Sequence, residues 1–208
     1  MERPEVTRAI TAAKSIATSL GLPTDDAVVL HTSNKLALRL TPCDVVARVD
    51  PGGEKRARFE VELAQRLLDA GGPIVPLDPR VEPRVYTREG FAVTLWTFCE
   101  PVTSQVDSDA YALALKRLHG ALRGIDLSSP RFTDRIAAAE RIVSVATRSP
   151  ELGDVDRAFL ADRLRSLRQA TENHGADEQP LHGEQRPPDE GRPVVPGFRD
   201  VLPWAGRV

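Results

Sequence analysis

The sequence is poor in cysteine, lacks any long apolar run and contains no block of like charge. Its two cysteines, Cys43 and Cys99, form no CxxC or Cys/His spacing that would indicate zinc. Their scarcity, and a polar N-terminal segment without a secretory pattern, predict a reducing, cytoplasmic environment. The longest apolar runs fall far short of the roughly 18 residues that a membrane span requires. The net charge is −2 with both signs interspersed, so nucleic acid and an acidic membrane surface are poor candidate partners.

The chain does contain a clear order of elements, in which strands come early and helices late. Apolar periodicity predicts helices over 4–20, 54–70, 109–123, 132–146 and 154–172, and strands over 27–31, 36–40, 45–49, 84–87 and 91–98. Strands that precede helices in this way favour an α+β fold with two lobes. We expect an N-terminal β-sheet lobe over 1–101, a helical lobe over 102–184, and an irregular tail rich in proline and glycine over 185–208.

Two charged residues, Arg48 and Glu60, indicate a function only when they are considered together. A strand over 45–49 places Arg48 on the face opposite Ala47 and Val49, and alone it reads as an exposed charge on an edge strand. Alone, Glu60 is an ordinary solvated helix residue. Together they fit a phosphate-binding cation that a helix carboxylate holds in place, as a strand Lys and a helix Glu do in protein kinases. We therefore expect Arg48 and Glu60 to lie within ion-pair reach and to be partly buried.

Five stretches make the reading more specific. They are VVARV, FEVELAQRLLDAGGPIVPL, FAVTLWTFCEP, ALKRLHGAL and LHGE. In order and spacing they resemble the bacterial aminoglycoside phosphotransferase-like proteins, which have a protein-kinase-like fold, and the resemblance covers about residues 25–184. Each stretch alone is weak, and the series of five carries the resemblance. It implies an ATP-binding N-lobe with Mg2+ as cofactor, and it makes His119 a scaffold residue.

The resemblance also assigns nucleotide-binding roles. It implies that Arg48 contacts the phosphates of ATP and that Glu60 orients Arg48. It implies that the turn HTSNK, around Asn34, lies over the nucleotide. That turn has no glycine, whereas phosphate-cradling loops favour glycine for close backbone approach, so nucleotide affinity could suffer.

A hinge is implied at Trp96, Thr97 and Phe98, which would read adenine through backbone groups. The alternative for Trp96 and Phe98 is plain core packing, and strand alternation should bury one of them in any case.

The tetrapeptide LHGE falls where the family has its catalytic loop. By resemblance Glu184 takes the place of the acid that orients the substrate hydroxyl and accepts its proton. Arg186 stands where the family has a His. Asp189 falls on the position of an Asn that holds magnesium, and an Asp could serve as well. Without the upstream matches, HGE in a polar loop would carry no meaning.

The tail departs from the family pattern. The family continues with two strands, the second of which carries an Asp-Phe-Glu or similar metal-binding segment. None is readable here. Codons can be chosen for 194–208 whose shifted frame reads Leu-Phe-Leu-Asp-Phe-Glu, which predicts a frameshifted, C-terminally truncated member. The alternative is a genuine short branch with a proline-rich tail, and the underlying DNA decides between them.

Three functional classes therefore stay open. The first is an active phosphotransferase that moves the γ-phosphate of ATP to a hydroxyl of a small molecule, impaired by its tail. The second is a nucleotide-binding pseudokinase, and the third is an inactive remnant. We also expect the later helices to bury apolar residues such as Leu113, Leu118 and Phe159 between them. Surface left uncovered by the missing family helices predicts self-association.

Overall fold

The computed structural model describes residues 3–100, 108–127, 131–174, 180–182 and 205–207. The fold is α+β, and the chain divides into two compact units between Ile125 and Asp126. The lobe boundary expected at residue 101 stays a prediction. The first unit holds α1 (Arg3–Ser19), β1 (Thr24–Thr32), β2 (Leu36–Pro42), β3 (Val45–Pro51), α2 (Glu54–Asp69), β4 (Tyr86–Arg88), β5 (Phe91–Thr97) and α3 (Ser108–Arg123).

A five-stranded antiparallel sheet forms the centre of the first unit, with the strand order β1-β2-β3-β5-β4. Strand β1 is an edge strand of this sheet, and its pairing with β2 is interrupted by register shifts between Thr24 and Asp26 and between Val29 and His31. Strand β3 lies at the middle, so both of its edges are paired, and most of its residues are buried.

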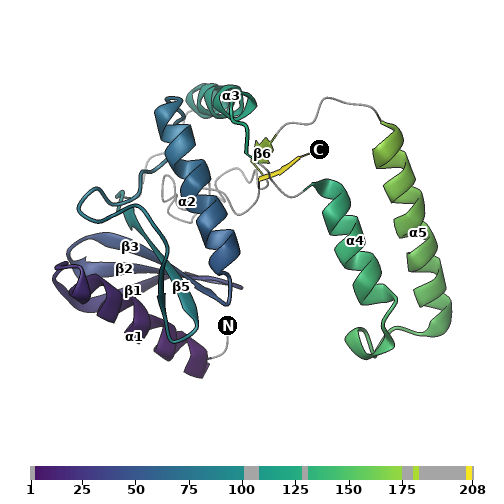
Figure 1. Ribbon diagram of the computed structural model, residues 1–208, viewed down its shortest axis with the longest axis horizontal. Helices are drawn as coiled ribbons and strands as arrows, with labels where there is room; N and C mark the ends of the chain where they lie inside the picture. The colour runs from purple at the N-terminus through teal and green to yellow at the C-terminus, as the bar shows by residue number, and fades with distance from the viewer. Residues whose placement is uncertain (1–2, 101–107, 128–130, 175–179, 183–204, 208) are drawn as a thin grey trace. The chain divides into compact units, whose positions relative to one another are not determined.

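The two helices α1 and α2 cover opposite faces of the sheet (Figure 1). Alternation along β3 explains this arrangement, because successive side chains of a strand point to opposite faces. Val45 and Val49 belong to the apolar cluster that contains the alanine-rich face of α1. Val46 belongs to the other cluster, which contains Ala57 and Val61 of α2.

The second unit contains a helical hairpin and a short β-pair. Its elements are α4 (Phe132–Val143), the 3₁₀ turn η1 (Ala146–Arg148), α5 (Asp154–Asn173), β6 (Pro180–His182) and β7 (Ala205–Arg207). Helices α4 and α5 lie side by side (Figure 1). Arg157 closes the turn between them by donating to the carbonyl oxygens of Val143, Ser149 and Leu152.

The expectation about the later helices was partly wrong. Leu118 is buried, but Leu113 and Phe159 are 58% and 57% exposed. Helices α3 and α5 belong to different compact units, and apolar periodicity alone does not indicate which helices share a core. Within the described residues, no helix combines the length and the apolar character needed to cross a membrane.

Candidate functional site

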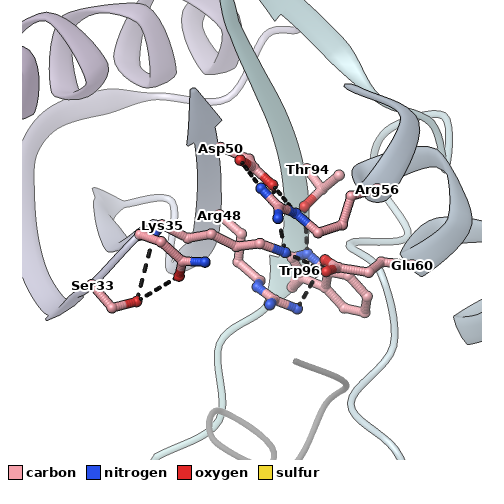
Figure 2. A network of polar contacts seen from close by, with 9 residues as sticks. Ser33, Lys35, Arg48, Asp50, Arg56, Glu60, Thr94 and Trp96 are labelled. Carbon is pink, nitrogen blue, oxygen red and sulfur yellow. Dashed lines mark hydrogen bonds and ion pairs between the residues drawn. The ribbon is translucent and has the colours of Figure 1, made fainter. Parts of the chain in front are cut away.

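Strand alternation gathers charged side chains on the sheet face that α2 covers. On β3, Arg48 and Asp50 alternate with the valines that face α1, so both lie on the α2 side. Lys35 precedes β2 by one residue, and Glu60 lies on the buried stripe of α2. Figure 2 shows the side chains of Lys35, Arg48 and Glu60 converging, with Arg56 and Asp50 next to them.

Glu60 holds two cations at once. The residue is only 4% exposed. One carboxylate oxygen, Oε1, accepts a hydrogen bond from Lys35 Nζ. The other oxygen, Oε2, lies 3.5 Å from Arg48 Nη1, which confirms the expected ion pair between Arg48 and Glu60. A single buried carboxylate therefore fixes both Lys35 and Arg48 on this face.

Asp50 forms the second acidic centre and is also buried, with 3% exposure. Arg56 donates to both of its oxygens, Nε at 2.8 Å and Nη2 at 2.7 Å, and Lys35 Nζ lies 3.6 Å away. The carboxylate packs against the first turn of α2, since a Cβ added to Gly53 would lie 2.1 Å from Asp50 Cγ. A negative charge at this helix end is favourable because the helix dipole is positive there.

Cations outnumber carboxylates among the described residues of this group. Three cations, Lys35, Arg48 and Arg56, face two carboxylates, Asp50 and Glu60. Burial lowers the pKa of Lys35, and the neighbouring Arg48 lowers it further. Glu60 and Asp50 raise this pKa, but their effect is the smaller one, so the pKa lies below its usual value. Three cations gathered on one largely buried sheet face make a favourable place for an anion.

Aromatic residues flank the charged group. Trp96 is buried at 3% exposure, so the alternation argument for one buried hinge aromatic is confirmed. Its Nε1 donates to Thr94 Oγ1 at 2.8 Å, and the Arg48 guanidinium lies 5.7 Å from its ring centroid. Phe98 is partly exposed and carries the guanidinium of Arg39 at 3.9 Å from its ring centroid.

The backbone at the expected hinge is partly engaged. The N–H of Thr97 donates to the carbonyl oxygen of Pro76 at 3.0 Å. Any reading of adenine by the segment 96–98 must therefore use other backbone groups, and that role stays a prediction.

Asn34 lies where the resemblance placed it, in the turn between β1 and β2, and is exposed. Ser33 Oγ donates to Asn34 Oδ1 at 3.1 Å, and the Ser33 N–H donates to the Lys35 carbonyl oxygen at 2.9 Å. The turn is thus closed by its own backbone. The role of Asn34 over a nucleotide stays a prediction.

Sequence reasoning missed Lys35, Asp50 and Arg56 as members of this group. Asp50 could have been found, because it lies two residues after Arg48 and so shares its strand face. Lys35 gave no such signal, since its approach to Glu60 depends on the register of the hairpin.

Of the expected catalytic loop, Leu181 and His182 lie in β6. Glu184, Arg186 and Asp189 lie outside the described residues, and so does the segment 194–204 of the expected frameshift. Within the described part of the chain, no group of three His, Cys, Asp or Glu side chains is placed to hold a metal ion.

No family model and no curated protein matches the sequence. Solved structures match by fold. The GDP complex of wild-type aminoglycoside 2'-phosphotransferase-IIIa aligns with a TM-score of 0.58 and 14% identity, over 100% of this chain and 75% of that chain. The GDP and kanamycin complex of APH(2")-IIia aligns with a TM-score of 0.58 and 16% identity, over 88% of this chain and 65% of that chain. An aminoglycoside-3'-phosphotransferase of type VIII aligns with a TM-score of 0.54 and 19% identity, over 93% and 77%.

Identities this low establish the fold and nothing finer. The chain has a kinase-like α+β phosphotransferase fold, and it spans about two thirds to three quarters of the length of these neighbours.

Proposed function

We propose that the chain is an ATP-dependent phosphotransferase that transfers the γ-phosphate to a hydroxyl group of a small molecule. The observation that carries the proposal is the ion pair between Glu60 of α2 and Arg48 of β3, in the β-sheet lobe of a kinase-like fold. The solved structure named as the GDP and kanamycin complex of APH(2")-IIia supports it, since that complex holds GDP and kanamycin on the same fold.

The chemistry asks the protein mainly for positioning and charge neutralisation, because phosphoryl transfer needs little covalent help. In this proposal Arg48 neutralises nucleotide phosphate charge, and Glu60 keeps the guanidinium in place. Glu184 accepts the proton of the acceptor hydroxyl. Mg2+ would supply further charge neutralisation, and Asp189 is its candidate ligand in the catalytic loop.

The second candidate is a nucleotide-binding pseudokinase. Two observations on the sequence favour it. The pair Arg48 and Glu60, which would bind the nucleotide phosphates, is present. In the expected catalytic loop, however, Arg186 replaces the family's His, and no Asp-Phe-Glu is readable after it. A remnant without any nucleotide affinity is the third outcome.

The test combines binding and turnover. The melting temperature of the purified chain is measured with ATP or GTP, with and without Mg2+, and phosphate transfer is followed with labelled nucleotide and a panel of amino-sugars. We expect nucleotide to raise the melting temperature of the wild type. Glu60→Gln should weaken binding about tenfold, since Arg48 loses its anchor. Glu62→Gln, on the exposed side of the same helix, is the matched control and should bind normally.

Each outcome decides something. Turnover that depends on Glu184 supports the phosphotransferase. Binding without turnover supports the pseudokinase. Absence of binding by the wild type overturns both and leaves the remnant.

A further inference from the structure

The turn between β1 and β2 presents a side-chain cation where nucleotide-binding turns often present backbone N–H groups. The turn has no glycine, and the Ser33 N–H is already used to close it onto the Lys35 carbonyl. The Lys35 side chain instead extends along the sheet face that α2 covers, to Glu60 and Asp50 (Figure 2). Positive charge thus comes to this face from the turn itself.

Lys35 and Arg48 are held as a pair by one carboxylate. Each takes a different oxygen of Glu60, so the two cations are kept close together while arriving from β3 and from the turn before β2. Two adjacent cations match a ligand with two adjacent anionic groups, such as the diphosphate of a nucleotide. A site with one phosphate-binding cation would need only Arg48 and its partner Glu60. Here a second cation, Lys35, is held in addition, between Glu60 and Asp50.

We propose that Lys35 is a second phosphate-binding cation of this site, which contacts the di- or triphosphate of a nucleotide together with Arg48. In this role its ammonium group does the work that backbone N–H donors do in a glycine-rich turn. The inference rests on the proposed nucleotide-binding function and adds a binding residue to it.

The charge environment of Lys35 supports this role. The groups that face it are Arg48 and Asp50 from β3, and Arg56 and Glu60 from α2. Burial and the adjacent Arg48 lower the pKa of Lys35, so the ammonium form is less stable here than in water. A phosphate bound beside it would favour the ammonium form. Phosphate binding and protonation of Lys35 should therefore strengthen each other.

The opposing reading is structural: Lys35 serves only to fasten the β1–β2 hairpin to α2. Both readings predict that a Lys35 variant loses some stability. They differ in how nucleotide affinity depends on pH, because only a phosphate-binding Lys35 makes affinity fall as the ammonium group loses its proton.

The test is calorimetric titration with metal-free ADP, and with inorganic pyrophosphate as a second probe, from about pH 7.5 to about pH 10, where the unperturbed Lys pKa of about 10.4 has begun to matter. We expect Lys35→Gln to weaken ADP binding about tenfold near neutral pH. Wild-type affinity should fall as the pH rises. Lys35→Arg, whose charge does not titrate, should bind like the wild type near neutral pH and keep its affinity at high pH. Lys55→Gln, an exposed lysine of α2, is the matched control and should change nothing.

A second measurement does not depend on how well the variants fold. The pKa of Lys35 in the wild type is followed by NMR of lysine side chains, with and without ADP, and ADP should raise it. Equal ADP binding by wild type and Lys35→Gln, or a Lys35 pKa that ADP leaves unchanged, overturns the inference while leaving the proposed function intact. Failure of the wild type to bind either ADP or pyrophosphate overturns both.

Discussion

The two cations that share Glu60 differ in kind. The planar guanidinium of Arg48 lies above the ring of Trp96, a contact that a lysine ammonium would make less well. Lys35 is titratable, and its surroundings lower its pKa. The site therefore combines a guanidinium that contacts an aromatic ring with a titratable ammonium group.

A separate buried carboxylate, Asp78, gives the first unit a measurable pH dependence. Arg80 grips both of its oxygens, Nε at 2.9 Å and Nη2 at 2.7 Å, and also donates to the carbonyl oxygen of Cys43 at 2.9 Å. Burial alone would raise the pKa of Asp78, but the hydrogen bonds from Arg80 outweigh it and hold the pKa below the usual 3.8. The stability that ionised Asp78 contributes is complete above that value and is lost as the pH falls through the folded-state pKa.

We expect Asp78→Asn to lower the free energy of unfolding by about 2 kcal/mol near neutral pH, because the half-exposed Arg80 loses a charged partner. The deficit should shrink below pH 3.8, where the wild type loses the same contribution. Urea unfolding at a series of pH values measures both. Glu82→Gln, which removes the exposed pair with Arg84, is the control and should cost less than about 1 kcal/mol throughout. A deficit of Asp78→Asn that stays constant into strong acid would contradict this account.

At the scale of the elements, the position of α2 is fixed from its first turn. The carboxylate of Asp50 fills the space beside Gly53, and Arg56 of the same helix holds that carboxylate with two hydrogen bonds. Glu60 follows Arg56 by one helical turn. The hydrogen bonds between Arg56 and Asp50 therefore also fix the position at which Glu60 contacts Arg48. The strand and the helix are thus coupled through one aspartate.

Gly53→Ala should break this coupling. A Cβ there would lie within 2.3 Å of the Asp50 carboxylate atoms, which cannot move aside without leaving Arg56 and Lys35. We expect a loss of about 1–3 kcal/mol in the free energy of unfolding, together with weaker nucleotide binding as Glu60 shifts. Chemical denaturation and nucleotide titration measure the two effects.

Gly120→Ala provides the matched control for this prediction. Gly120 lies within α3, and a Cβ there would meet nothing within 4 Å. Replacing a helical glycine by alanine should stabilise the protein by about 0.5–1 kcal/mol. Equal effects of the two substitutions would show that the space beside Gly53 is not what matters.

The elements could be predicted from the sequence because their periodicities are local. The alternation Val45, Ala47, Val49 already assigned Arg48 to the opposite face, and the helical placement of Glu60 followed from the stripe of α2. The involvement of Lys35 could not be predicted, since Leu36 pairs with Val49 only through the register of two strands. The prediction of how the later helices pack was partly wrong for a related reason. Apolar spacing indicates which face of a helix is buried, but it does not indicate which element packs against that face.

At the scale of the whole molecule, the second unit leaves apolar side chains in solvent. Val155 is 83% exposed and Phe159, one turn further along α5, is 57% exposed, with Leu160 and Ile142 exposed nearby in the same unit. No described residue of α5 is buried. A helix that keeps its apolar residues in water is a candidate for contact with another surface.

We therefore expect concentration-dependent self-association, and we expect the double substitution Val155→Glu and Phe159→Lys to reduce it strongly. Sedimentation velocity over a range of concentrations measures the oligomer fraction. Glu172→Lys, an exposed change further along α5, is the control and should leave it unaltered. A wild type that remains monomeric at high concentration would rule out this role for the α5 surface.

The edge strand β1 has a consequence for colloidal behaviour. Among the described residues, nothing pairs with its outer edge, and Val28 and Val29 are exposed on it. Such an edge can template intermolecular sheet growth and aggregation. Two features of the strand oppose that outcome. Asp25 and Asp26 place negative charge at its beginning, and the two register shifts bend it away from the flat geometry that a stacking copy needs. The irregular pairing of β1 with β2 is, in these terms, a safeguard against fibre formation.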